Sequence, residues 1–208
     1  MKHVIFDFDG TLVDSLPVVL RIARKMVPGL NWSQDEIQKV RNMPAKEVIK
    51  YSGLSYWQLA RLMLKGKKIM SGHLDELKVF PGMHQAIRSL QTSGYQLSVV
   101  SSNSEAIIRQ VLKREKIEDC FVGVYGNVGL FSKSRVFKVV LKDQKAVASD
   151  AIYVGDEVRD IDSAHKSGIP IISVTWGYNA EPILTKSQPT YLAHNPQELL
   201  RVIEQASA

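Results

Sequence analysis

The chain has 208 residues, of which 45% are hydrophobic and 23% charged. This composition is typical of a soluble globular protein with one core and room for a small insertion. No apolar run approaches the ~20 residues of a membrane helix, and the first residues lack the architecture of a signal peptide, so we expect no membrane partner. Cys120 is the single cysteine, which excludes an internal disulfide and favours a reducing, cytoplasmic location.

The formal net charge of +6 is unevenly distributed along the chain. Residues 16–79 contain 12 Lys and Arg against 5 Asp and Glu, whereas the other residues contain 15 against 16. This asymmetry predicts an anionic partner, either a small phosphate or a polyanion. The basic residues do not alternate with aromatic ones along a stripe, so we expect no nucleic-acid partner.

The first predicted strand is the apolar run HVIFDF at residues 3–8. It is continuous enough for burial on both faces of a parallel sheet. Residues 16–77 then follow a helical pattern, in which Val19, Ile22 and Met26 are spaced by three or four. Turn-forming residues divide this stretch into several helices, and it contains no predicted strand.

Strands and helices alternate from residue 79 onward. The predicted strands are residues 96–101, 121–125, 151–155, 169–175 and 190–193. The predicted helices lie at residues 85–91, 105–116, 134–142 and 196–205, and one more helix follows the strand at 151–155 and ends at residue 166. Such alternation implies parallel strands joined by right-handed crossovers. The sequence therefore predicts an α/β fold. Residues 1–15 and 79–208 form a core with a doubly wound parallel sheet, and residues 16–78 form an inserted helical cap.

Polar residues stand at the carboxyl ends of three of the predicted strands: Asp7 and Asp9, Ser101 and Ser102, and Asp156. Ligands of doubly wound sheets bind beyond the carboxyl ends of the strands. Carboxylates brought together repel each other unless a cation neutralises them. Oxygen ligands without His or Cys are those that Mg²⁺ prefers. The sequence therefore predicts a Mg²⁺ site at this edge of the sheet.

The two aspartates at the end of the first strand also indicate a type of chemistry. A carboxylate is a competent nucleophile toward phosphorus, so Asp7 can attack while Asp9 protonates the leaving oxygen and then deprotonates water. Gly10 removes a side chain where the backbone must approach the phosphoryl group. We therefore expect phosphoester chemistry at this position.

Four motifs occur in order over about 150 residues: DFDGT at 7–11, VVSSN at 99–103, Lys133 before a helix, and GDEVRD at 155–160. They resemble the four motifs of the haloacid dehalogenase superfamily, in its aspartyl-phosphatase branch with a helical (C1-type) cap. The resemblance implies a doubly wound core with a cap inserted after the first motif, where the basic helical stretch lies. The late segment 175–200 is similar to phosphoglycolate phosphatase-like members.

The resemblance implies a role for each matching acidic residue. Asp7 would be the nucleophile and a Mg²⁺ ligand. Asp9 would be the acid and base, and its backbone carbonyl would also bind the metal. Asp156 would be the third protein ligand, with Glu157 or Asp160 behind it or as an auxiliary ligand.

The resemblance also implies residues that hold the phosphate. Lys133 would neutralise charge on the phosphate and on the nucleophile, which agrees with the need to stabilise a transferring phosphoryl group. Arg135 and Lys138 are rivals in the same stretch. A serine would donate a hydrogen bond to the phosphate. Counting along the strand favours Ser101, whereas the motif favours Ser102.

These observations predict a Mg²⁺-dependent phosphatase that acts on a small phosphorylated metabolite through a phospho-Asp7 intermediate. A phosphoglycolate-like compound and a sugar phosphate are the substrate classes considered. The cap would close over the site and contact the leaving group, with Arg41 and Lys46 as candidates for holding a second anionic group. A phosphomutase of the same fold and a catalytically weak regulatory or binding module are the alternatives, and the oligomeric state stays open.

Overall fold

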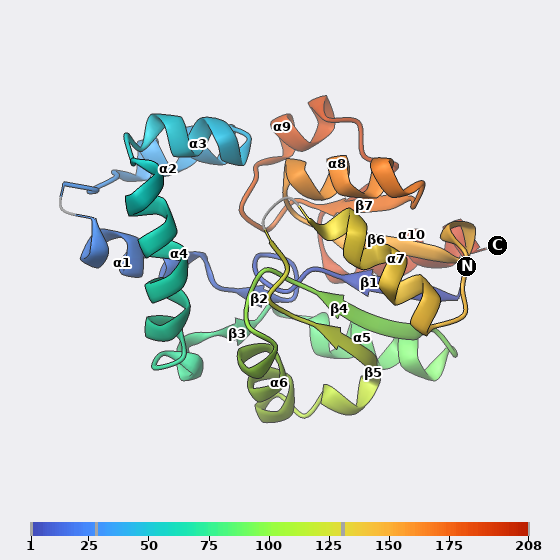
Figure 1. The fold of residues 1–208 in the computed structure, drawn as a ribbon. Coiled ribbons are helices and arrows are strands. Elements are labelled where there is room, and N and C mark those ends of the chain that lie inside the picture. Colours follow the sequence, from blue (N-terminus) through green and yellow to red (C-terminus); the bar gives the residue numbers. More distant parts are fainter. Residues whose placement is uncertain (1, 28, 130–131, 208) are drawn as a thin grey trace.

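The computed structural model describes residues 2–27, 29–129 and 132–207. Its centre is a six-stranded sheet in which all neighbouring strands are parallel (Figure 1). The strand order is β5-β4-β1-β6-β7-β8. Because β1 lies in the middle, the chain winds outward from it in both directions. The strands are Phe121–Tyr125, Gln96–Val100, His3–Phe6, Ala151–Gly155, Ile171–Val174 and Tyr191–Ala193 in that order.

Helices cover both faces of the sheet because its strands are apolar on both faces. In β1, Val4 and Phe6 belong to one buried cluster and Ile5 to the other, as the two-residue period of a strand requires. The first cluster includes α5, α6 and α10, and the second includes α7, α8 and α9. Their bounds are Met83–Thr92, Glu105–Arg114, Pro196–Ser207, Lys133–Asp143, Val158–Ser167 and Glu181–Lys186. The predicted doubly wound α/β fold is confirmed.

Four α-helices lie between residues 15 and 71 of the described chain, after β1 and before α5, and we call them the inserted helices. They are α1 (Leu16–Met26), α2 (Gln34–Arg41), α3 (Ala45–Tyr51) and α4 (Tyr56–Met70). α1 packs along α4. The group stands beyond the carboxyl end of β1, at the left of the view (Figure 1). The expected helical insertion is thus present, while its role as a cap and its division from the core at residues 15/16 and 78/79 stay predictions.

The structure adds a small two-stranded sheet and a short helix that the sequence pattern does not predict. β2 (Val13–Asp14) and β3 (Lys78–Val79) pair in antiparallel fashion where the chain enters and leaves the inserted helices. Two residues are too few for an alternating pattern to be recognised. The other addition is α9, a six-residue helix that carries Pro182 in its first turn. Within the described ranges, no helix has the length and apolar character that a membrane crossing needs.

Candidate active site

The carboxyl ends of three neighbouring strands bring the predicted polar residues together. β1 pairs with β4 on one side and with β6 on the other. Asp7 and Asp9 follow β1, Ser101 and Ser102 follow β4, and Asp156 follows β6. These segments are far apart in the sequence and adjacent only in the fold. The parallel register therefore assembles the candidate site.

Asp7 lies at the centre of the site, with 2% of its surface exposed. Its Oδ1 accepts a hydrogen bond from the backbone N–H of Phe8 at 2.7 Å, and its Oδ2 accepts one from Lys133 Nζ at 2.5 Å. Burial raises the pKa of Asp7 to about 7; the Lys133 charge opposes this rise and the Asp160 carboxylate adds to it. Cationic groups around Asp7 therefore decide how much of it is ionised.

Lys133 is buried at the first turn of α7 and uses all three of its N–H donors inside the site. Besides Asp7, Nζ donates to the Tyr153 hydroxyl at 2.8 Å and to Asp160 Oδ1 at 2.7 Å. Burial alone would lower the pKa of Lys133, but Asp160 and Asp7 raise it above its usual value. The rivals Arg135 and Lys138 are exposed on the same helix, so Lys133 is the lysine that the fold brings to the acidic cluster.

Three buried carboxylates converge on one point: Asp7, Asp156 and Asp160 each offer an oxygen within 4.8 Å of the others. Asp160 accepts hydrogen bonds from Lys133, Tyr153 and the backbone N–H groups of Asp156 and Glu157. Four bonds occupy all four of its lone-pair positions. Of its two predicted roles, Asp160 therefore fits the position behind Asp156 better than that of an auxiliary metal ligand.

Asp156 differs from Asp160 because it keeps acceptor capacity. Its Oδ1 accepts from the Thr11 hydroxyl and its Oδ2 from the backbone N–H of Tyr178, both at 2.7 Å. Two bonds leave two lone pairs for another ligand. Burial raises the pKa of Asp156 well above its usual range, and the charges of Glu157 and Asp7 add to the rise. A divalent cation would relieve this electrostatic cost.

Glycines on two loops make room for the Asp156 carboxylate. A Cβ on Gly10, whose φ is +77°, would lie 2.2 Å from Asp156 Oδ2, and a Cβ on Gly177 would lie 2.3 Å from the same oxygen. The sequence predicts close approach at Gly10, although toward the phosphoryl group. In the structure the group nearest to Gly10 is the carboxylate of Asp156.

Asp9 points to a different neighbour from Asp7. Its Oδ2 accepts a hydrogen bond from Asn103 Nδ2 at 3.0 Å. Burial raises the pKa of Asp9, and hydrogen bonds from Ser15 and Asn103 oppose the rise. Asn103 also lies 3.3 Å from the sulfur of Met70 at the end of α4. The sequence prediction assigns Asn103 no role, although the VVSSN motif contains it.

The two candidate serines occupy different positions. Ser101 is 1% exposed, and its Oγ accepts the backbone N–H of Asn103 at 3.1 Å. Ser102 is partly exposed and lines a cavity together with Asp9. Of the two serines, Ser102 is therefore the one that lines the cavity.

The loop after β7 connects the inserted helices with the acidic cluster. Asn179 Nδ2 donates to the carbonyls of Arg41 and Met43 at 3.1 and 3.0 Å, while its Oδ1 accepts the backbone N–H of Val158 at 2.9 Å. Tyr178 contributes the N–H that holds Asp156. Neither residue has a sequence signal beyond its place in the late segment that resembles phosphoglycolate phosphatase-like members.

The remaining predicted residues are charged groups near this loop. Arg41 donates from Nη2 to the Gly177 carbonyl at 2.9 Å and from Nε to the Tyr178 carbonyl at 3.3 Å. Lys46 is exposed and is absent from the described cavity lining. Glu157 accepts hydrogen bonds from Arg159, a residue to which the sequence prediction gives no role. The substrate-binding roles of Arg41 and Lys46 stay predictions.

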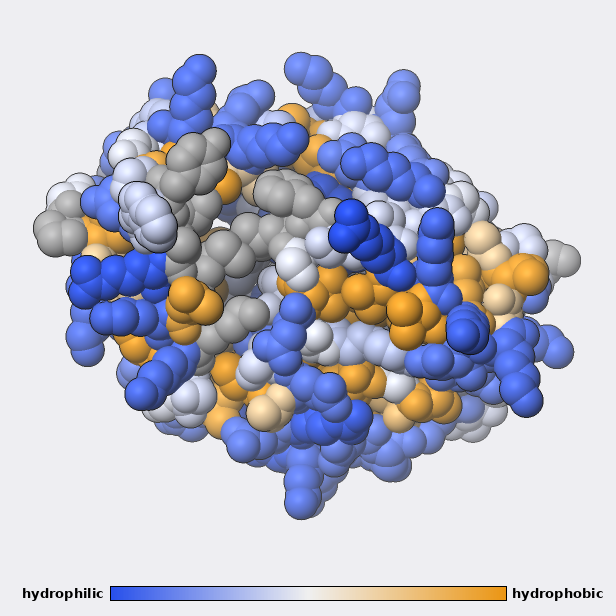
Figure 2. Space-filling view, viewed as in Figure 1, coloured by the Kyte–Doolittle hydropathy of each residue, from blue (hydrophilic) through white to orange (hydrophobic). Residues whose placement is uncertain are grey.

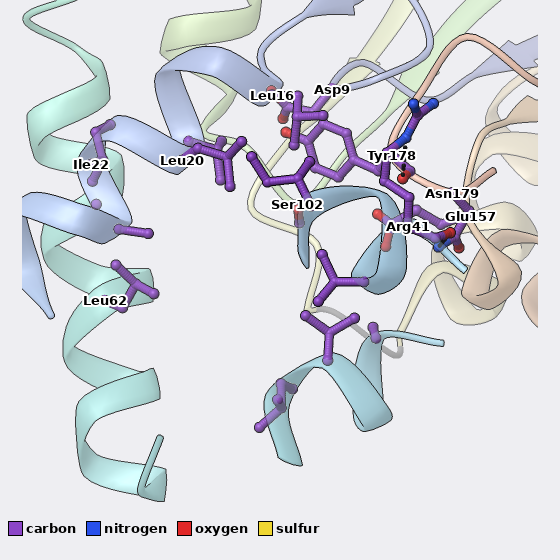
Figure 3. A pocket seen from close by; sticks show the side chains of 18 of the residues that line it. Asp9, Leu16, Leu20, Ile22, Arg41, Leu62, Ser102, Glu157, Tyr178 and Asn179 are labelled. Carbon is purple, nitrogen blue, oxygen red and sulfur yellow. Dashed lines mark hydrogen bonds between the residues drawn. The ribbon is translucent and has the colours of Figure 1, made fainter. Parts of the chain in front are cut away.

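A cavity of about 380 Å³ lies between the inserted helices and the edge of the sheet. Polar residues labelled in the close view, including Asp9, Arg41, Tyr178 and Asn179, gather at one end of it, whereas Leu20, Ile22 and Leu62 lie toward the other (Figure 3). The face of the molecule in Figure 2 carries hydrophilic side chains around several groups of hydrophobic ones.

Known proteins share this architecture. The family model described as haloacid dehalogenase-like hydrolase matches residues 4–174. A phosphoglycolate phosphatase of Synechococcus elongatus is 32% identical over 208 residues, covering 99% of this chain and 98% of the relative. One from Vibrio parahaemolyticus is 25% identical over 221 residues, covering 98% and 96%. A solved haloacid dehalogenase-like hydrolase from Streptococcus pneumoniae has a TM-score of 0.79 and 25% identity, covering 98% of each chain.

The chain belongs to the haloacid dehalogenase-like hydrolase family, because the family match covers most of its length. Its named relatives indicate that it is a phosphatase. The family resemblance drawn from the four sequence motifs is confirmed.

Proposed function

We propose that this chain is a Mg²⁺-dependent phosphatase that hydrolyses a small phosphomonoester through a phosphoryl intermediate on Asp7. The observation that carries the proposal is the position of Asp7. It is buried, bonded to Lys133, and within 4.8 Å of the carboxylates of Asp156 and Asp160. An acid so placed serves as a nucleophile once its negative charge is balanced.

Asp7 and Asp156 are the side chains proposed to hold the metal, together with the backbone carbonyl of Asp9. The donor set fits, since both carboxylates retain lone pairs, and hard oxygen donors suit Mg²⁺. When bound, the ion would neutralise charge on the phosphoryl oxygens and on the carboxylates. Asp160 is proposed to support the site because it accepts a hydrogen bond from Lys133. Glu157, which accepts a hydrogen bond from Arg159, is proposed to lie behind the metal ligands.

The proposed reaction has two steps. In the first, an oxygen of Asp7 attacks phosphorus, the bond between phosphorus and the ester oxygen breaks, and Asp9 donates a proton to the departing oxygen. In the second, Asp9 takes a proton from water, whose oxygen attacks phosphorus and releases phosphate and Asp7. Lys133 stabilises charge on the phosphoryl oxygens, and Ser102 donates a hydrogen bond to them.

The inserted helices are proposed to act as a cap, residues 16–78, over a core formed by residues 1–15 and 79–208. The cavity between them supports this division, because residues from both parts line it. The relatives' names suggest phosphoglycolate-like compounds as one class of small substrate, and sugar phosphates are a second class. The reaction needs no nucleic acid or membrane partner.

A phosphomonoester panel tests the proposal. Wild type should release phosphate from at least one small ester in the presence of Mg²⁺, and Asp7→Asn should lose nearly all of this activity. Mg²⁺ should also raise the melting temperature of wild type and raise that of Asp156→Asn much less, which provides a readout independent of turnover. Retained activity in Asp7→Asn would contradict the nucleophile assignment. Phosphoryl return to a sugar would identify a phosphomutase, and absence of turnover would favour a regulatory module.

A further inference from the structure

The walls of the cavity are apolar where the leaving group of the substrate would lie. Every one of the four inserted helices contributes apolar side chains to them: Val19, Ile22, Val40, Val48, Leu62 and Met70 are examples. Asp9, the proposed proton donor to the leaving oxygen, lines the same cavity. A group attached to that oxygen would therefore extend from Asp9 toward the inserted helices (Figure 3).

The charged side chains among the described lining residues are engaged with other protein groups. Arg41 bonds the carbonyls of the loop after β7, Arg159 bonds Glu157, and Asp9 accepts from Asn103. Asp9, Arg41 and Glu157 also gather at the end of the cavity near the sheet (Figure 3). A leaving group long enough to pass this end enters the apolar part, where a carboxylate would be an uncompensated and costly charge.

We propose that the cavity binds an apolar alcohol, so that the preferred substrates are phosphomonoesters of alkyl or arylalkyl alcohols rather than of hydroxy acids. The inference rests on the proposed phosphatase activity, and it names a substrate class that differs from the phosphoglycolate-like compounds and sugar phosphates suggested above. A volume of about 380 Å³ is at the small end of ligand sites, which suits an alcohol of a few carbon atoms. The expected preference for apolar alcohols differs from the substrate in the name of this chain's relative, phosphoglycolate phosphatase.

A series of primary alcohol phosphates tests the inference with wild type. Methyl, butyl and isopentyl phosphates differ mainly in apolar surface, and phosphoglycolate replaces that surface by a carboxylate. We expect kcat/KM to rise about threefold to fourfold for each methylene that the cavity buries, so that butyl and isopentyl phosphates exceed phosphoglycolate at least tenfold. Equal values for methyl and isopentyl phosphates, or a preference for phosphoglycolate, would overturn the inference.

Two leucines on α4 provide matched variants. Leu62 lines the cavity, whereas Leu64 is 76% exposed. Leu62→Lys should lower kcat/KM for isopentyl phosphate at least tenfold and raise the ratio of phosphoglycolate to butyl phosphate turnover. Leu64→Lys should leave both values unchanged. Circular dichroism melting shows whether each variant folds, and an unfolded Leu62→Lys leaves the wild-type series to decide.

A binding measurement separates this inference from the proposed function. Titration calorimetry of Mg²⁺-loaded wild type would compare isopentylphosphonate with phosphonoacetate, neither of which requires turnover. Tighter binding of isopentylphosphonate without hydrolysis of any ester would support the cavity assignment and contradict the phosphatase proposal. Hydrolysis of esters together with tighter binding of phosphonoacetate would support the phosphatase proposal and contradict the cavity assignment. Binding of neither phosphonate would overturn the cavity assignment.

Discussion

Arg41 of α2 is hydrogen-bonded to the carbonyl of Gly177, at 2.9 Å, on the opposite side of the candidate site. Gly177 packs against the Asp156 carboxylate, and the next residue, Tyr178, donates its N–H to that carboxylate. A contact from the inserted helices thus reaches the acidic cluster through a single loop. Arg41 is therefore placed to position Asp156 as well as to line the cavity.

Arg41→Ala should lower kcat/KM about tenfold to a hundredfold, because hydrogen bonds from a charged donor contribute about 1.5–3 kcal/mol and their loss frees the loop that holds Asp156. The decrease should be similar for methyl phosphate and phosphoglycolate. Amide hydrogen exchange at residues 177–180 should become faster. Arg61→Ala, an exposed arginine of α4, is the control.

The sequence prediction for Arg41 gives a different pattern. If its guanidinium bound a second anionic group of the substrate, Arg41→Ala would impair phosphoglycolate turnover and leave methyl phosphate turnover intact. Steady-state kinetics on these two esters therefore decides between the positioning role and the binding role.

Lys133→Met should destabilise the protein and nearly abolish activity. The substitution leaves Asp7 and Asp160 buried without the ammonium that both contact, and breaking a buried ion pair costs about 3–5 kcal/mol. The loss of charge next to the phosphoryl group should lower kcat at least about a hundredfold. Denaturant unfolding and steady-state kinetics measure the two effects.

Lys138→Met provides the matched control on the same helix, because Lys138 is exposed. Its unfolding free energy should stay within about 0.5 kcal/mol of wild type. A Lys133→Met variant with activity within tenfold of wild type would show that another cation stabilises the phosphoryl group.

Residues at the ends of strands were the part of the site accessible from the sequence. Asp7, Ser101 and Asp156 follow apolar runs that can be recognised without a structure, and parallel topology then requires their ends to meet. Tyr178 and Asn179 act through backbone and amide contacts within an irregular loop. No periodicity or spacing records such contacts, so they emerge only from the fold.

The same limit applies to the cavity. The basic character of residues 16–79 predicts an anionic partner, and the sequence prediction places Arg41 and Lys46, near a turn between helices, close to the substrate. In the structure the apolar faces of the inserted helices line the cavity. Net charge reports the solvent-facing side chains, whereas the lining depends on how four helices are oriented.

Gly10→Ala should disrupt the acidic cluster. A Cβ at this position would lie 2.2 Å from Asp156 Oδ2, and the backbone has φ +77°. Displacement of the carboxylate should abolish the increase in melting temperature on addition of Mg²⁺, together with phosphatase activity.

Gly94→Ala separates the steric effect from backbone strain. Gly94 has φ +85° and nothing within 4 Å of its Cβ position, so this variant incurs only the strain, about 1–2 kcal/mol. It should keep the Mg²⁺-induced shift and the activity. Equal behaviour of the two variants would mean that the contact with Asp156 is unimportant.

His194 should make a pH-dependent contribution to stability. Hydrogen bonds with Glu181 and Glu198 raise its pKa above the usual value, and they connect the loop before α10 with α9. Because the folded-state pKa is the higher one, the contribution is fully present below about pH 6.5 and is lost as pH rises through the raised value. The pair is about half exposed, so we expect less than about 1 kcal/mol.

Denaturant unfolding of wild type and His194→Gln measures this contribution. The difference in unfolding free energy should be larger near about pH 6 than near about pH 9. In a Glu181→Gln background the pH dependence should shrink, because the hydrogen bond with Glu181 is the largest single cause of the raised pKa. A difference that stays constant with pH, or grows toward alkaline pH, would show that protonation of His194 does not stabilise the fold.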